Sequence, residues 1–184
     1  MKHLGNRRAL LQVWLRARTL AEIGKWQAAD NDFQRAIKLT NEPMPDHFLE
    51  RSKNLQLNKQ GEKALEVLEE GIKCLGPAII TLQMEALDQE ILLGRYPAAL
   101  ARLDHLLERA ARKETYLIRK AEIFEKMEDP KKAQHFYAEA LRAIEALPDQ
   151  QRKHKATIKL ENQVRAHLNH YRLKAIEFIS SEDD

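Results

Sequence analysis

Two histidines near the C-terminal end have the most suggestive spacing of any residue pair in this sequence. His167 and His170 are three residues apart, so on a helix both imidazoles would share one face and could contribute to a metal site. The carboxylates that could join them, Glu161 and Glu177, lie more than a turn away. We therefore expect no metal site and interpret both histidines as ordinary polar positions beside Leu168.

No other arrangement of residues predicts catalysis. The remaining histidines have no recurring relationship to a serine, a cysteine or a carboxylate; they are His3, His47, His105, His135 and His154. The sequence has no glycine-rich phosphate loop, no His-Glu-x-x-His helix and no paired-cysteine motif. Adjacent carboxylates such as Glu69 and Glu70 would diverge on a helix. We expect neither an enzyme nor a cofactor.

The single cysteine and the charge balance exclude further classes. Cys74 has no partner in the chain for a disulfide or a multi-cysteine zinc site, and we expect it to be a buried, small apolar residue. The net charge is only +3, the remainder of 31 basic and 28 acidic residues. A field this weak gives no reason to expect binding to nucleic acid or to an anionic membrane.

Two basic patches leave an alternative open. The patches are Gln151-Arg152-Lys153-His154-Lys155 with Lys159, and Arg7, Arg8, Arg16 and Arg18. Such patches could contact phosphates or an acidic partner. Neither patch alternates cations with aromatic residues in the way that base stacking needs, so we favour the interpretation that they are the solvated sides of amphipathic helices.

The composition predicts the elements that carry these residues. Leucine and alanine far outnumber valine and threonine, which favours helices over strands. No apolar run approaches the ~20 residues that a membrane span needs, and the first residues lack a secretory apolar core. We expect a soluble, all-α protein located in the cytoplasm, with a periplasmic or secreted location as the alternative if a leader has been removed.

Glycine and proline divide the chain into helical segments. They fall at Gly24, Pro43, Pro45, Gly61, Gly76, Pro77, Gly94, Pro97, Pro130 and Pro148. Between them, apolar residues recur at three- and four-residue spacing, as in Ala64, Leu68, Ile72 and Leu75. Because the connections are short, successive helices should form antiparallel hairpins.

The same pattern of small and large residues occurs four times. The small residues are Ala29, Ala64, Ala99 and Ala133, at offsets of 35, 35 and 34. Four residues after each comes a larger one: Phe33, Leu68, Leu103 and Tyr137. Three further on come Ala36, Gly71, Leu106 and Ala140. A small residue lets two helices approach closely and the large one fills the groove toward the next hairpin, so the pattern predicts stacked hairpins.

This register resembles the tetratricopeptide repeat family, whose unit is about 34 residues long. Residues 24–39 match the family best, and Gly94 and Tyr96 stand at its glycine and aromatic turn positions. The first helices match less well in repeat one, with Val13 and Arg16-Ala17, and better in repeat four, with Leu117, Ala121 and Phe124. The resemblance implies a right-handed superhelical α-solenoid of about nine helices, with hairpins at approximately 10–43, 45–78, 80–113 and 114–147.

The last part of the chain differs from the repeats. Residues 149–179 contain no glycine or proline and predict one long helix, with a stripe formed by Ala156, Leu160, Val164, Leu168, Tyr171, Ala175 and Phe178. We expect residues 149–180 to form a helix that caps the stack, and residues 181–184 to be a frayed acidic tail. Alternatively, this helix folds into the groove.

In the family that this chain resembles, the first helices line a concave groove that holds a peptide or a partner helix. The resemblance places these residues on that face: Leu11, Trp14, Arg18, Glu22, Leu49, Lys53, Gln56, Thr81, Met84, Asp88, Ile118 and Glu122. Trp14 is the best single candidate because an aromatic anchor gains most from a partner. The alternative for each residue is packing against a neighbouring hairpin.

The clamp that some family members use for the C-terminal carboxylate of heat-shock chaperones is absent. The matching positions hold Trp14, Arg18, Glu50, Thr81 and Glu85, so a carboxylate would meet two acids. We expect a protein–protein interaction scaffold or adaptor. The alternatives are a structural protein that dimerises through the C-terminal helix and, less favoured, a nucleic-acid-binding repeat.

Overall fold

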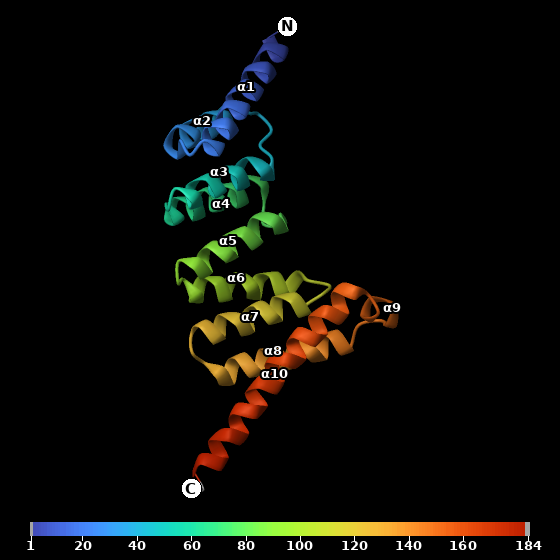
Figure 1. Ribbon diagram of the computed structural model, residues 1–184. Coiled ribbons are helices and arrows are strands. Elements are labelled where there is room, and N and C mark those ends of the chain that lie inside the picture. Colours follow the sequence, from blue (N-terminus) through green and yellow to red (C-terminus); the bar gives the residue numbers. More distant parts are fainter. Residues whose placement is uncertain (1, 183–184) are drawn as a thin grey trace. The chain divides into compact units, whose positions relative to one another are not determined.

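The computed structural model describes residues 2–182, and side-chain surroundings for residues 8–174. This part of the chain contains ten helices and no strand, which confirms the all-α prediction (Figure 1). The helices are α1 (Lys2–Glu22), α2 (Trp26–Leu39), α3 (Pro45–Leu57), α4 (Gly61–Leu75), α5 (Ile80–Leu92), α6 (Tyr96–Arg109), α7 (Glu114–Lys126), α8 (Pro130–Glu145), α9 (Asp149–Arg152) and α10 (Lys155–Glu182). None of them is both long enough and apolar enough to cross a bilayer.

The helices fall into an N-terminal unit, Met1–Arg95, and a C-terminal unit, Tyr96–Asp184. In the N-terminal unit, each helix from α1 to α5 packs against the next, and α3 also packs against α5. Figure 1 shows these helices from blue to green, with consecutive helices running in opposite directions. In the C-terminal unit, α6 packs on α7, α7 on α8, and α8 on α10.

The turns that follow α1, α3, α5 and α7 share one backbone conformation. Each has a residue with positive φ: Gly24 (76°), Lys59 (57°), Gly94 (71°) and Glu128 (58°). The next amide then bonds to a carbonyl five residues earlier, as in Lys25 N to Leu20 O at 2.8 Å and Gln60 N to Leu55 O at 2.9 Å. This is the Schellman helix end, which satisfies the last carbonyls of each helix and reverses the chain.

The predicted register of small and large residues is buried throughout. All four small residues have no exposed surface, and the four larger residues that follow them are at most 2% exposed. In the first hairpin, Ala29 and Phe33 form a core with Trp14, Ala17 and Ala36. The small residues therefore let the two helices of a hairpin come together, as the pattern predicted.

Gly71 shows why the third position of the register varies. It is buried in α4, and a Cβ atom there would lie 2.7 Å from Cγ of Phe48 on α3. At the equivalent position of repeat one, Ala36 is tolerated in a core built around Trp14 and Phe33. The ring of Phe48 therefore occupies the volume that a side chain would need in repeat two.

Residues 149–182 form two helices instead of the single helix expected. The carbonyl of Pro148 accepts bonds from the amides of Gln151 and Arg152, so the short α9 starts directly after the proline, and the chain then turns at Lys153 and His154 before α10 begins. The turn lets α10 pack back on α8.

The apolar stripe of α10 is only partly as expected. Val164 is buried in a core with Tyr137 and Ile144, and Leu160, Leu168 and Tyr171 pack against it. Ala156, by contrast, is exposed, and Thr157 is buried in its place. Ala175 and Phe178 lie outside the residues whose side chains are described.

Two further expectations differ from the structure. Cys74 is exposed, because it points away from the face of α4 that carries Leu68 and Gly71. The first helix begins at Lys2 and not near residue 10, so α1 is 21 residues long.

Candidate functional site

A surface cavity lies among α1, α2 and α3 of the N-terminal unit. Its volume is about 330 Å³, and its lining residues are Arg18, Ala21, Glu22, Trp26, Phe33, Glu50, Lys53, Asn54 and Leu57. We call it the Lys53 cavity. It contains three of the residues that the sequence predicted for a partner-binding face, namely Arg18, Glu22 and Lys53.

An ion pair holds one wall of the Lys53 cavity. The guanidinium of Arg18 on α1 donates to both carboxylate oxygens of Glu50 on α3, with Nε 2.7 Å from Oε2. The hydrogen bond to Glu50 raises the pKa of Arg18 above its usual value, so the guanidinium stays charged. Because Glu50 neutralises Arg18, the cation left for a ligand is Lys53, which is exposed and forms no ion pair with a described residue.

The floor of the cavity contains a buried amide that the sequence did not reveal. Asn54 is 2% exposed, and its Nδ2 donates to the carbonyl of Trp26 at 3.0 Å. Its Oδ1 is buried and accepts no hydrogen bond from any described residue. A buried carbonyl oxygen without a donor is unfavourable by about 1–3 kcal/mol, so Asn54 weakens the packing of α3 locally.

Trp14 does not lie open on the surface. It is 8% exposed, and its ring meets Phe33 edge to face at 4.9 Å and the imidazole of His47 at 4.7 Å. Leu49 is half-buried against the core around Phe48, and Met84 is also half-buried. Leu11, in contrast, is 57% exposed. Trp14 and Leu49 therefore pack within the fold, which is the alternative stated for each residue of the predicted face.

The other residues predicted for the concave face are distributed over both units. Gln56 donates to Glu85 at 3.0 Å, while Thr81 and Asp88 are exposed on α5. Ile118 and Glu122 belong to the C-terminal unit, where Ile118 packs against the core around Tyr137 and Glu122 accepts from Arg119 at 3.0 Å. The structure therefore gathers Arg18, Glu22 and Lys53 into one cavity but not the whole set.

The two acids at the chaperone-clamp positions are engaged within the protein. Glu50 pairs with Arg18, and Glu85 accepts from Gln56. A ligand carboxylate at these positions would meet negative charge instead of lysine or arginine.

His167 contacts other side chains of the C-terminal unit. Nδ1 of His167 lies 3.2 Å from Oε1 of Glu125, and its ring stacks on Tyr137 with the centroids 4.4 Å apart. In the part of the chain that the structure describes, no three histidine, cysteine or acidic side chains gather in a way that could hold a metal ion.

Solved structures with similar helical stacks identify the fold. A putative kinesin light chain from Podosopora anserina with nearly identical TPR-like repeats matches with a TM-score of 0.60, covering 94% of this chain and 92% of its own at 15% identity. A tetratricopeptide repeat protein from Parabacteroides merdae gives 0.59 over 95% and 80%, at 12% identity. The fold is that of the tetratricopeptide repeat proteins.

YrrB, described as a TPR protein with an unusual peptide-binding site, is a further match to the tetratricopeptide repeat fold. Its TM-score is 0.57, over 73% of this chain and 69% of its own, at 15% identity. No family model and no curated protein matches the sequence. The likeness to these structures is thus one of fold, at 12–15% identity.

Proposed function

We propose that this chain is a non-catalytic interaction scaffold that binds a peptide or helix of a partner protein at the Lys53 cavity. The observation that carries the proposal is the combination of an unpaired lysine and exposed leucine surface around one hollow. Lys53 and Leu57 supply these two features from a single helix, α3.

Each feature suits a different part of a polypeptide. Lys53 can pair with an acidic side chain, and Leu57, at 54% exposed, can cover an apolar one. The neighbouring residues Leu11 and Leu15 on α1 extend the apolar surface. The fold supports the proposal, since YrrB has the same fold and is described with a peptide-binding site.

The residues predicted from the sequence enter this proposal with different roles. Arg18, Glu22 and Lys53 form the polar walls, and Leu11 contributes exposed apolar surface. Trp14 supports the site from below through its contacts with Phe33 and His47. Because Glu50 and Glu85 replace the clamp residues, we propose that chaperone C-terminal carboxylates are not ligands.

The test is quantitative recovery of partners from an extract of the source organism on immobilised protein. We expect Lys53→Glu and Leu57→Ser each to lose the specific partner that the unchanged chain retains. Lys63→Glu, a change at an exposed lysine at the start of α4, is the matched control. Equal recovery by Lys53→Glu and the control, with both variants folded by circular dichroism, would refute the cavity as the binding site.

Self-association is the second candidate function. Leu173 on α10 is 60% exposed and could be covered by a second copy. If this leucine meets a second copy, light scattering will give a dimer mass for the unchanged chain and a monomer mass for Leu173→Glu. A monomer mass for both chains, at concentrations up to those used for binding, removes this candidate.

A further inference from the structure

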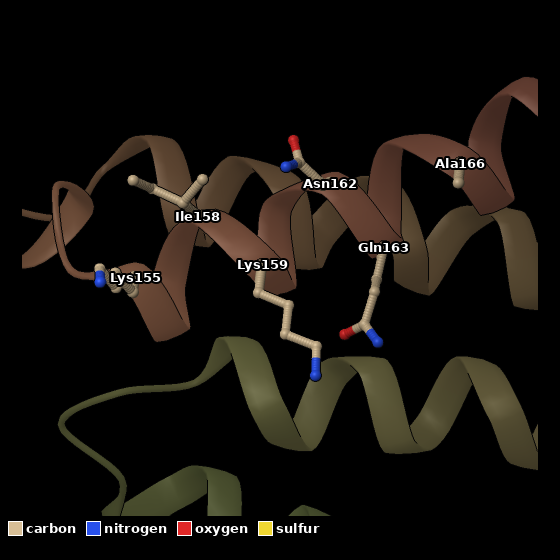
Figure 2. A pocket seen from close by; sticks show the side chains of 6 residues that line it. All are labelled: Lys155, Ile158, Lys159, Asn162, Gln163 and Ala166. Carbon is tan, nitrogen blue, oxygen red and sulfur yellow. The ribbon is translucent and has the colours of Figure 1, made fainter.

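A second hollow lies along α10 in the C-terminal unit. Its volume is about 500 Å³, and its lining residues are Lys155, Ile158, Lys159, Asn162, Gln163 and Ala166. Lys155, Lys159, Gln163 and Ala166 step by three or four residues, as do Ile158 and Asn162, so the six residues share one broad face of the helix. Figure 2 shows Lys159 and Gln163 extending to one edge of this face and Asn162 to the other. We call this surface the α10 face.

The charge of the α10 face is of one sign. It contains two lysines and no carboxylate, and neither Lys155 nor Lys159 forms an ion pair with a described residue. Arg165, on a neighbouring side of the same helix, is instead held by Glu145 at 3.0 Å and Glu161 at 2.8 Å. The two lysines are thus available to a partner, while Arg165 is used within the fold.

Apolar surface lies between these cations. Ile158 is 44% exposed and lies in sequence between the two lysines, and Ala166 adds small apolar surface one turn beyond Asn162. An isoleucine at this exposure is not needed for the core of the C-terminal unit, which Leu160 and Val164 complete from the opposite side of α10. A partner helix that covers Ile158 would remove this surface from water.

The composition of the α10 face favours a protein ligand over a nucleic acid. Single-stranded nucleic acids are bound by aromatic side chains that stack on bases, and the six lining residues include none. Two lysines would neutralise few phosphates, and the apolar side chain of Ile158 could not form a hydrogen bond to the edge of a base. The amides of Asn162 and Gln163 can donate to and accept from polar side chains at the border of a helix–helix contact.

We propose that the α10 face docks an acidic amphipathic helix of a partner protein, with its apolar ridge on Ile158 and Ala166 and its carboxylates on Lys155 and Lys159. This surface is separate from the Lys53 cavity and does not depend on it. The sequence drew attention to Lys155 and Lys159 as part of a basic patch, and the structure places them beside an exposed apolar residue.

The experiment uses the full chain and a fluorescein-labelled model peptide of about 18 residues, which is long enough to form several turns of helix. The peptide has leucines at three- and four-residue spacing flanked by glutamates, and a second peptide has lysines in place of the glutamates. By fluorescence anisotropy we expect only the acidic peptide to bind, more weakly as salt rises. Lys155→Glu with Lys159→Glu should weaken its binding roughly tenfold or more.

The controls separate this surface from general charge effects and from the Lys53 cavity. Lys63→Glu with Lys126→Glu reverses the same number of exposed charges elsewhere and should leave the affinity within about twofold. Ile158→Ser should weaken binding without changing the charge. The same titration on Lys53→Glu separates the two sites, because Lys155→Glu with Lys159→Glu should weaken binding by the same factor with and without Lys53→Glu.

Three results would overturn the proposal. The first is equal affinity of the Lys155/Lys159 double variant and the Lys63/Lys126 control. The second is an oligothymidine strand that binds more tightly than the acidic peptide and is displaced by the same two substitutions, since the face would then be a nucleic-acid surface. The third is a dimer, detected by light scattering, that Ile158→Ser dissociates, because a second copy would then be the occupant.

Discussion

The hydroxyl of Tyr171 donates a 2.7 Å hydrogen bond to Oε1 of Glu125, which joins α10 to the last turn of α7. The other oxygen of the same carboxylate accepts from the hydroxyl of Tyr137 on α8 at 3.1 Å. His167, stacked on Tyr137, also contacts Oε1 of Glu125. One carboxylate thus connects three helices of the C-terminal unit.

Replacing this carboxylate should loosen α10. Glu125→Gln keeps the shape but removes the charge and one acceptor oxygen, so at least one hydroxyl loses a charge-assisted bond. We expect a loss of about 2 kcal/mol in the free energy of unfolding, with faster amide hydrogen exchange in α10. Glu139→Gln, at the surface of α8, is the control and should change stability by less than about 0.5 kcal/mol.

The two tyrosines predict a loss of stability at high pH. Burial, and next the carboxylate of Glu125, raises the pKa of Tyr137 above its usual value of 10, and the same causes raise the pKa of Tyr171. The stability that a raised tyrosine pKa reflects is fully present below about pH 10. It is lost as the pH rises above that value. Chemical denaturation at pH 8, 10 and 11 should show this decline.

The double variant Tyr137→Phe with Tyr171→Phe provides the comparison at high pH. It should be less stable than the unchanged chain at pH 8, because it lacks both bonds to Glu125, and its decline above pH 10 should be smaller. An equally steep decline in the double variant would mean that other groups cause the alkaline loss.

His47 predicts a loss of stability on the acid side. Its Nδ1 accepts the amide of Met44 at 3.1 Å, and burial lowers the pKa of its imidazole, against the opposing charges of Glu50 and Asp46. A lowered histidine pKa means that the unfolded chain binds the proton more readily, so stability present above about pH 6.5 is lost as the pH falls below it.

Denaturant unfolding between pH 5 and 7.5 tests this effect. His47→Gln should flatten the pH dependence in this range, while His105→Gln, at an exposed position on α6, should leave it unchanged. Identical pH profiles for His47→Gln and the unchanged chain would count against the role of this imidazole.

Gly71 should not tolerate a methyl group. Alanine improves helix propensity by up to about 1 kcal/mol, but its Cβ would lie 2.7 Å from the ring of Phe48, and overpacking of this kind costs about 1–3 kcal/mol. We expect Gly71→Ala to destabilise the N-terminal unit by about 1 kcal/mol or more in thermal or chemical unfolding.

Gly61→Ala is the milder counterpart. The atom that its Cβ would approach is Nε2 at the end of the Gln89 side chain, which can move more easily than a ring. If Gly61→Ala destabilises the chain more than Gly71→Ala does, then the contact with Phe48 is not what requires glycine in α4.

The turns at Lys59 and Glu128 offer stabilising substitutions. Both residues have positive φ, which for a non-glycine residue is unfavourable by about 1–2 kcal/mol, partly offset by the greater freedom of glycine in the unfolded chain. We expect Lys59→Gly and Glu128→Gly each to raise the free energy of unfolding by about 0.5 kcal/mol. Gly24→Ala, at the equivalent turn, should lower it, and a stabilising effect there would contradict the argument.

These turns show what the sequence could and could not predict. Gly24 and Gly94 stand at the positive-φ position of two turns, whereas Gly61 and Pro130 marked the other two turns from two residues beyond Lys59 and Glu128. The sequence therefore located all four turns but did not predict that Lys59 and Glu128 adopt positive φ, which for such residues is unfavourable by about 1–2 kcal/mol. The break between α9 and α10 was missed because it depends on how α10 packs on α8.

Three of the residues around the candidate site came from the resemblance to the repeat family. The resemblance pointed to Arg18, Glu22 and Lys53 on the first helices, and these three line the Lys53 cavity. The resemblance could not decide whether Trp14 packs or binds, since an aromatic residue suits both roles. Asn54 was missed because an amide looks like a surface residue until its burial and its bond to Trp26 are known.

Cys74 has a practical consequence. It is the only cysteine in the chain and is exposed near the end of α4, in the N-terminal unit. A maleimide dye would therefore attach at one defined position of the natural sequence, without any substitution. Its emission would report on the unfolding of the N-terminal unit. The fluorescence of the tyrosines around Glu125 would report on the C-terminal unit.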